Sequence, residues 1–155
     1  MLRICVRRFS LRMNLSLTVF VPRFSLGHIF NSILHPTMKI AIVGSRTFHD
    51  YDLMCDFIER KLSDEEFNSI EAVVSGGARG ADSLAEQYAR ENGLEMIVFK
   101  ADWRGLGSKA GPMRNVEIVR ECDICFAFWD GKSSGTRHDI ELCKQMGKVC
   151  HICKF

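Results

Sequence analysis

Residues 72–82 read Ala-Val-Val-Ser-Gly-Gly-Ala-Arg-Gly-Ala-Asp. The stretch starts as an apolar run, turns through three glycines and leads into a segment with apolar residues at helical spacing. A strand buried on both sides is a continuous apolar run, and glycine permits the tight turn that follows it. We therefore predict a strand over Ala72–Ser75, a Gly-rich turn over Gly76–Gly80, and a helix capped by Asp82 that runs to Glu91.

The same alternation of strand, turn and helix continues on both sides of this stretch. The other predicted strands are Lys39–Val43, Met96–Phe99, Ile124–Phe128 and Val149–Ile152. The other predicted helices are Asp52–Leu62, Gly111–Glu121 and Thr136–Met146, and a loop is expected through Trp103, Gly105 and Gly107. Strands that alternate with helices predict a single Rossmann-like α/β domain, with a five-stranded, mainly parallel sheet and helices on both faces.

The first 37 residues differ from the rest of the chain in composition. They contain five Arg and no Asp or Glu, whereas residues 38–155 contain 16 Lys and Arg against 19 Asp and Glu. Such a prefix resembles a transit peptide. Met38 directly precedes the first predicted strand, however, which favours a start assigned too early; a structural role is the third alternative. We place the domain at residues 38–155 and treat residues 1–37 as a non-domain extension.

Length and composition exclude several classes of protein. A chain of 155 residues, 46% of them hydrophobic and 26% charged, fits one globular domain. It contains no run of 18 apolar residues, so we expect no membrane-spanning helix and no membrane partner. The net charge of +2 does not by itself indicate nucleic acid. Seven cysteines, an odd number, without a convincing secretion signal indicate reduced thiols and a cytoplasmic location.

Two cysteine pairs have a spacing that is common among metal ligands. Cys122 and Cys125 form one CxxC pair, and Cys150 and Cys153 form another; four thiolates together bind zinc in many proteins. However, Cys125 and Cys150 fall in predicted strands, where residues i and i+3 point to opposite faces. The interval between the pairs is also longer than in zinc ribbons. We therefore expect no metal site and no cofactor.

The chemically distinctive residues follow the predicted strands. Sheets of this type bind ligands beyond the carboxyl ends of the strands, where the strand order reverses. Two Gly-rich turns there lead into helices, whose first N–H groups suit a phosphate. The expected ligand-binding residues share this edge; they are Gly44, Ser45, Arg46, Gly76, Gly77, Arg79, Gly80, Asp82, Trp103, Lys109, Arg114, Asn115, Trp129, Asp130, Gly135 and Thr136.

Each of these residue types also has an ordinary structural explanation. Glycine after a strand is common because tight turns need it. Trp103 and Trp129 either cover the edge of the sheet or stack on a base. Any one Arg is typically a solvated surface residue, so the prediction of a phosphate site depends on several cations following several strands.

Five motifs occur in one order along the chain, and they cover residues 38 to about 153. They are Val43–Arg46, Ser75–Asp82, Ala101–Trp103, Ala110–Asn115, and Phe128–Gly131 with the following Gly135–His138. Together they resemble the YspA/YpsA-related branch of the SLOG superfamily, which includes DprA and the "Lonely guy" phosphoribohydrolases. The resemblance implies a Rossmann-like fold with a nucleotide-type ligand at the strand ends.

The phosphoribohydrolase branch implies one set of catalytic residues. There, an Arg before a helix and a Glu in a Gly-Gly-x-Gly-Thr-x-x-Glu segment act on the N-glycosidic bond of a nucleoside monophosphate. Arg114 matches that Arg, Gly135-Thr136 matches the Gly-Thr, and Asp139 falls where the Glu stands, with Glu141 as an alternative acid. Ser133-Ser134 replaces the paired glycines, and the acid is one methylene shorter.

The resemblance therefore leaves three functions open. The first is a nucleotide or nucleotide-derivative binding protein, which the loops and the arginines favour. The second is a phosphoribohydrolase-like enzyme. The third is a DprA-like module for single-stranded DNA, since Ser75–Asp82 and Arg114-Asn115 are similar to motifs of that branch. The surplus of acids in residues 38–155 counts against the third, because neutralisation of phosphates usually drives DNA binding. The superfamily also implies a homo-oligomer.

Overall fold

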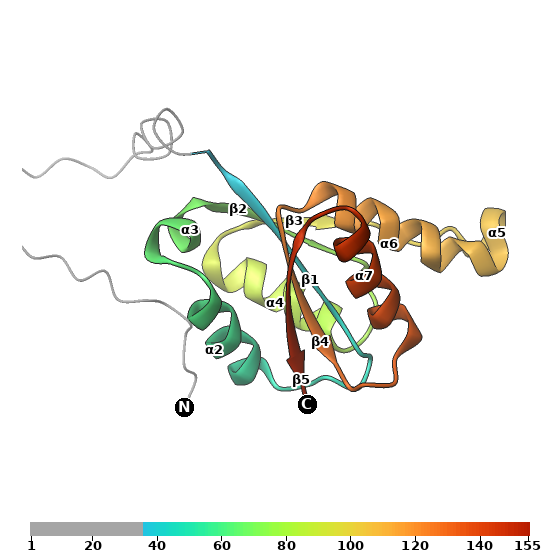
Figure 1. The fold of residues 1–155 in the computed structure, drawn as a ribbon, viewed down its shortest axis with the longest axis horizontal. Helices are drawn as coiled ribbons and strands as arrows, with labels where there is room; N and C mark the ends of the chain where they lie inside the picture. The colour runs from blue at the N-terminus through green and yellow to red at the C-terminus, as the bar shows by residue number, and fades with distance from the viewer. Residues whose placement is uncertain (1–35) are drawn as a thin grey trace, which may run out of the picture.

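The structure is a computed structural model that describes residues 36–155, and its centre is a five-stranded sheet (Figure 1). The strand order is β3-β2-β1-β4-β5, and every neighbouring pair is parallel. The strands are β1 (Met38–Gly44), β2 (Ile70–Ser75), β3 (Glu95–Val98), β4 (Ile124–Trp129) and β5 (Val149–Lys154). The predicted fold class is confirmed, and the sheet is parallel throughout. Residues 1–35 of the predicted N-terminal extension lie outside the described residues.

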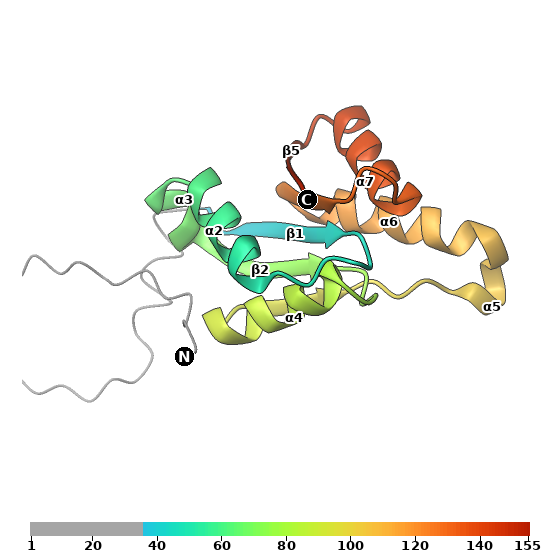
Figure 2. The ribbon, with the colours of Figure 1, turned by 90° about the horizontal axis from the view of Figure 1, so that it is seen from below.

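The long helices cover the sheet in two layers (Figure 2). They are α2 (Tyr51–Lys61), α4 (Ala81–Asn92), α6 (Ala110–Glu121) and α7 (Ser134–Gln145). Helices α2 and α4 pack on one face, and α6 and α7 pack on the other. Because side chains alternate along a strand, Ile40 and Ile42 of β1 join the first layer, whereas Ala41 and Val43 join the second.

The two layers differ in the size of their side chains. The α2–α4 side contains Phe48, Tyr88, Phe126 and Phe128, all buried. The rings of Phe48 and Phe128 stack with centroids 4.6 Å apart. The α6–α7 side consists of Ala, Val, Ile and Leu together with cysteines. Three of the buried residues on this side are cysteines: Cys122, Cys125 and Cys143.

The short elements depart from the sequence prediction. Helix α3 (Asp64–Ser69) was not predicted, although Ser63 and Glu66 form a capping box that is visible in the sequence. The expected loop after β3 contains a one-turn helix, α5 (Trp103–Leu106), and a 3₁₀ turn, η1 (Gly107–Lys109). Asp102 caps α5 by accepting the N–H of Gly105 at 2.9 Å.

The prediction that Asp82 caps α4 is wrong. Gly80 is the cap residue, with φ at +82°, and Asp82 lies inside the first turn of the helix. Its carboxylate accepts the N–H of Ala78 at 3.1 Å. The carboxylate therefore stabilises the preceding glycine-rich turn. At the other end, Gly93 stops the helix in the left-handed conformation.

The segment from α5 to the start of α6 extends beyond the end of the sheet (Figures 1 and 2). We call residues 102–113 the arm. Three apolar side chains on it are exposed: Trp103 at 59%, Met113 at 49% and Leu106 at 39%. The arm therefore adds little apolar burial to the folded domain.

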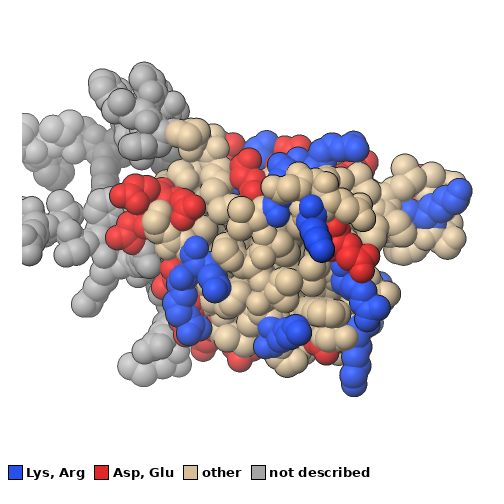
Figure 3. Space-filling view, viewed as in Figure 1, with Lys and Arg blue, Asp and Glu red and all other residues tan. Residues whose placement is uncertain are grey.

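Charged side chains are mixed in sign over the face drawn in Figure 3. Basic and acidic residues surround a largely uncharged centre there, which agrees with the small net charge of the chain. In the described part of the chain, the helices are all too short or too polar to cross a bilayer. A cytoplasmic location stays a prediction.

Candidate ligand site at the strand ends

A large cavity opens where the parallel strands end. Its volume is about 1450 Å³, and the loops after β1, β2, β3 and β4 all contribute to its lining. The chain passes from β1 to β2 on one side of the sheet and reaches β4 on the other, so the strand order reverses at β1. Ligands of open α/β sheets bind at such a point. The cavity lies where the sequence predicted a site.

The ends of β1 and β4 are fastened together below the cavity. The N–H of Ser45 donates to the carbonyl of Phe128 at 2.8 Å, and the Ser45 hydroxyl accepts the N–H of Asp130 at 3.1 Å. Asp130 in turn accepts the N–H groups of Lys132 and Ser133 through one carboxylate oxygen, at 2.9 and 2.8 Å. These bonds lower the pKa of Asp130 and order the loop that leads into α7.

A carboxylate in the first turn of α4 faces the loop after β2. Asp82 is 4% exposed and accepts the N–H of Ala78 in the turn before α4. Burial raises the pKa of Asp82, while the Ala78 N–H and the Arg114 guanidinium oppose that rise. This carboxylate therefore occupies the Ala78 N–H of the glycine-rich turn. An anionic ligand therefore has to find its positive partners elsewhere in the cavity.

Arg114 is the central cation of the cavity. It comes from α6 and reaches the end of β2: its Nη1 donates to the carbonyl of Gly76 at 3.0 Å, and its Nε donates to the side-chain oxygen of the neighbouring Asn115 at 3.1 Å. Nη1 also lies 3.9 Å from a carboxylate oxygen of Asp82. A Cβ on Gly76 would overlap the guanidinium, so glycine at this position makes room for the arginine. Arg114 is thus held in place by contacts within the protein.

Asn115 connects α6 to the start of α7. Its side-chain amide donates to the carbonyl of Gly135 at 3.2 Å and lies 3.4 Å from Nδ1 of His138. Thr136 is 2% exposed, and its hydroxyl donates to the hydroxyl of the cap residue Ser133 at 3.0 Å. The N-terminus of α7 therefore forms one wall of the cavity.

Asp139 is the least satisfied polar group of the site. It lies on α7, is 6% exposed and lines the cavity. Its Oδ1 has no hydrogen-bond partner among the described residues. Burial raises its pKa to about 8, against the opposing effect of the Arg114 guanidinium, and Asp82 adds to the rise. At neutral pH Asp139 is therefore mainly a protonated carboxyl that can donate a hydrogen bond to a ligand.

The rim of the cavity is basic and exposed. Arg46, Arg79, Lys100 and Lys132 lie there, on the four loops that follow β1 to β4. The indole of Trp103 lines the outer side and approaches Gly111 on α6. Cations at the rim and carboxyl groups at the floor give the cavity two chemically different ends.

Most of the expected ligand-binding residues line this cavity. They are Gly44, Arg46, Gly76, Gly77, Arg79, Asp82, Trp103, Arg114, Asn115, Asp130, Gly135 and Thr136, and the expected catalytic residue Asp139 joins them. Lys100, Lys132 and His138 also line it, although the sequence did not place them in the binding set. The sequence could have indicated them, because Lys100 and Lys132 lie in loops that follow strands and His138 lies in the first turns of α7.

Five of the expected site residues lie outside the lining. Ser45 is buried and joins β1 to β4, and Gly80 packs against the backbone of the loop after β1. The Trp129 indole donates to the carbonyl of Ser133 at 3.1 Å, with Arg137 and Lys154 over its ring. Lys109 and Glu141 are exposed on η1 and α7. Glu141 is two residues from Asp139, and residues at that helical spacing face different sides.

The cysteines do not pair as the CxxC spacing would suggest. Cys125 of β4 lies beside Cys150 of β5 in the sheet register, and Cys143 of α7 packs against both. Cys122 ends α6 with its thiol directed at the carbonyl of Val119, and Cys153 joins the opposite face. The argument that i and i+3 residues diverge agrees with this arrangement, but the sequence did not predict that three thiols would meet.

Fold and site together define a Rossmann-like domain with a large cavity at the strand ends. Residues 38–105 match the protein family described as "YspA, cpYpsA-related SLOG family". The "Gene 61 protein" of Mycobacterium phage D29 is 37% identical over 115 residues, which cover 70% of this chain and 90% of the phage protein. The chain belongs to the YspA/cpYpsA-related SLOG family, as its motifs predicted.

Two solved structures of DNA processing protein A share the fold. The protein from Helicobacter pylori, studied for its single-stranded DNA binding mode, matches with a TM-score of 0.57 and 19% identity over 76% of this chain. The protein from Streptococcus pneumoniae (DprA) matches with the same TM-score and identity over 75%. The matches span 65% and 50% of those two chains. At this identity they show the fold alone.

Proposed function

We propose that this protein binds a nucleotide or nucleotide derivative in the cavity at the strand ends. The observation that carries the proposal is the buried group at its floor, where Asp139 has an unpartnered oxygen near the fixed guanidinium of Arg114. A buried polar atom without a partner costs free energy, so a ligand that supplies one is favoured there.

The two ends of the cavity match the two ends of a nucleotide. Phosphate oxygens suit the exposed cations at the rim, especially Arg46, Arg79 and Lys132. The polar edge of a sugar or base suits the carboxyl and amide groups of Asp139 and Asn115. When the sugar occupies the floor, the base stacks on Trp103, which stands at the outer side with most of its surface in solvent.

A second candidate is cleavage of an N-glycosidic bond, and Asp139 is the specific reason to keep it. A carboxyl with its pKa raised to about 8 is protonated at neutral pH, so it can protonate a leaving base as a general acid. Arg114 would hold the negative charge of the substrate. The likeness to DNA processing protein A supports single-stranded DNA as the third candidate.

Titration calorimetry on the full chain tests the binding proposal. The panel contains AMP, ADP-ribose, NAD and a short oligothymidylate, each at two salt concentrations. We expect a mononucleotide or dinucleotide to bind, and Arg114→Gln to weaken that binding at least tenfold, or about 1.4 kcal/mol. Arg120→Gln, an exposed arginine on the same helix outside the lining, is the matched control and keeps its affinity.

The other outcomes separate the candidates. Binding of the oligothymidylate alone, with a steep loss of affinity as salt rises, would favour single-stranded DNA. Release of free base and ribose phosphate, detected by HPLC with mass spectrometry and lost in Asp139→Asn, would establish the hydrolase. Equal nucleotide affinity in Arg114→Gln and the original chain would show that the nucleotide does not bind in this cavity.

A further inference from the structure

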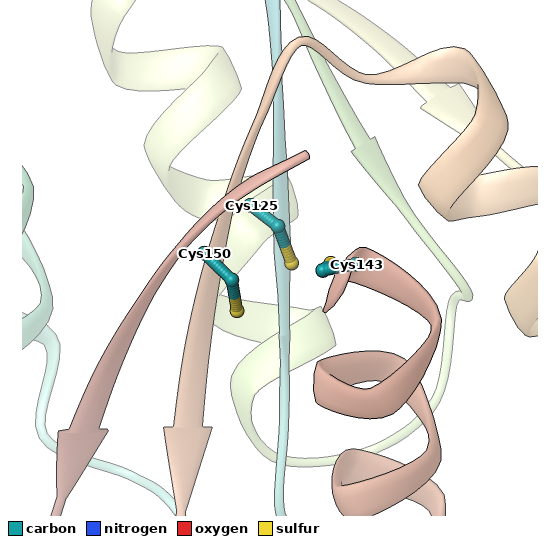
Figure 4. A group of neighbouring side chains, drawn as sticks. All are labelled: Cys125, Cys143 and Cys150. Carbon is teal, nitrogen blue, oxygen red and sulfur yellow. The ribbon is translucent and has the colours of Figure 1, made fainter. Parts of the chain in front are cut away.

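Three thiols meet on the α6–α7 side of the sheet, one turn of α7 beyond the residues of that helix that line the cavity. Cys125 on β4 and Cys150 on β5 are register partners on adjacent parallel strands, and Cys143 enters from α7 (Figure 4). Their sulfur atoms all lie within 4.8 Å of one another. The three residues come from three different elements, so the folded domain itself assembles the cluster.

This spacing is close to what one ion with three sulfur ligands needs. Metal–thiolate bonds of about 2.3 Å place sulfur atoms roughly 3.8–4.0 Å apart in tetrahedral or trigonal geometry. Small rotations of the cysteine side chains bring sulfurs from within 4.8 Å to that separation. None of the three cysteines forms a disulfide, so all three sulfur atoms are available as ligands.

The number of ligands selects the kind of ion. Among the described residues, no further His, Cys, Asp or Glu joins the group of three. Structural zinc sites have four protein ligands, whereas soft thiolate ligands also select Cu(I), which accepts three. Cys125 and Cys143 are fully buried among apolar side chains such as Val119 and Leu142, so water has little access as a fourth ligand.

The surroundings provide an entrance and a nearby positive charge. Cys150 is only half-buried, so an ion can reach the group from the β5 side. Lys148 donates from its Nζ to the carbonyl of Cys122 at 2.7 Å, at the end of α6 beside this cluster. An ammonium there partly offsets the negative charge that a monovalent ion with thiolate ligands carries.

We propose that Cys125, Cys143 and Cys150 form a three-sulfur binding site for a thiophilic cation, with Cu(I) as the ion that fits it. On binding, the ion displaces protons from the thiols to solvent and forms three metal–sulfur bonds. Copper stays monovalent throughout, so no oxidant or reductant is needed.

The test titrates the full chain with Cu(I) without oxygen, against the coloured chelator bicinchoninate. We expect one equivalent of Cu(I) to be withdrawn from the chelator. Cys150→Ser should weaken that step at least tenfold, because two of three ligands remain. Cys153→Ser is the matched control, since it lies on the same strand but faces the other side of the sheet, and its Cu(I) affinity should be unchanged.

Two further measurements keep the outcome clear. Circular dichroism melts of each variant establish that it is folded, and Cys150→Ala replaces Cys150→Ser if the serine variant is not. X-ray absorption at the copper edge should give three sulfur neighbours at about 2.3 Å. Equal Cu(I) affinity in the Cys150 and Cys153 variants, or fewer than three sulfur neighbours, would overturn the proposal and leave the thiols as small core residues.

Discussion

The inner wall of the cavity and the arm that borders it are built in opposite ways. On the inner wall, Asp82, Asn115, Thr136 and Asp139 are all under 10% exposed, and the first three form hydrogen bonds with the turn before α4 or the start of α7. On the arm, Trp103 keeps more than half of its surface in solvent. Hydrogen bonds within the fold hold most of the inner wall, whereas most of the Trp103 surface is not packed against the fold.

This difference separates stability from binding. A change on the inner wall disturbs groups that also hold strands and helices together, so it affects the free energy of unfolding and the ligand affinity together. A change on the arm removes little buried surface, so its effect should fall on binding alone. Four substitutions test that separation: two at glycines that support the inner wall, one at its buried carboxyl group, and one on the arm.

Among the glycine substitutions, Gly80→Ala should lower stability the most. Gly80 has φ at +82° and ψ at −128°, a conformation that residues with a side chain rarely adopt, and an added Cβ would overlap the backbone of Ser45 and Arg46. Strain and overlap together should cost at least about 3 kcal/mol of unfolding free energy. Urea unfolding measures this loss.

Gly131→Ala is the matched control for that substitution. Gly131 has φ at +77°, but no atom lies within 4 Å of an added Cβ. Only backbone strain remains, so the cost should be about 1 kcal/mol. Equal losses in the two variants would show that close packing at Gly80 does not hold the loop after β1 against α4.

Gly76→Ala should lower affinity more than it lowers stability. The added Cβ would overlap the Arg114 guanidinium, which sits at the end of a flexible side chain and can move away. We expect ligand affinity to fall at least tenfold with a loss of about 1 kcal/mol or less in stability. Calorimetry with the best nucleotide of the panel, beside a urea melt, provides both numbers. Unchanged affinity would mean that the fixed position of Arg114 does not matter.

The sequence predicted the strand ends well because local chemistry determines them. Apolar runs followed by glycine mark β1 and β2, and the alternation with helices determines a parallel sheet whose carboxyl ends share one edge. Arg114 and Gly76 could therefore be assigned to one site without a structure. The contact between them was not predictable, because it joins residues 38 positions apart through a side-chain conformation.

The failures share a different cause. Asp82 looked like a helix cap because aspartate is favoured at that position, but Gly80 is the cap residue, and the carboxylate accepts the Ala78 N–H instead. The unpartnered state of Asp139 and the meeting of three thiols depend on how α7 packs on β4 and β5. Tertiary packing of this kind leaves no periodic signal in a single sequence. The predicted homo-oligomer stays a prediction.

Asp139→Asn should change how stability depends on pH. The pKa of Asp139 is raised from 3.8 to about 8, so the folded state binds a proton more tightly than the unfolded state does. This contribution is fully present below pH 4 and is lost as pH rises toward about 8, by at most about 1.4 kcal/mol per pH unit. The asparagine variant lacks this decline.

Urea melts of both proteins between pH 5 and pH 8 measure that slope. The stability of the original chain relative to Asp139→Asn should fall as pH rises through this window. Glu141→Gln is the matched control, because Glu141 is an exposed acid on the same helix, and its curve should run parallel to the original. Parallel curves for Asp139→Asn as well would show that Asp139 is ionised in the folded protein.

Trp103→Ala should have the smallest effect on stability and should isolate the arm. The indole is 59% exposed, so its loss should change the unfolding free energy by about 0.5 kcal/mol or less. If a base stacks on it, nucleotide affinity should fall by about 1 kcal/mol, or roughly fivefold. Trp103→Phe, which keeps an aromatic face, should recover most of that loss.

Ligand quenching of the tryptophan fluorescence should vanish in the Trp103 variants and persist in Trp129→Phe. If quenching instead persists in the Trp103 variants and vanishes in Trp129→Phe, then the ligand lies nearer to α7 than to the arm. The arm would then not contribute to binding.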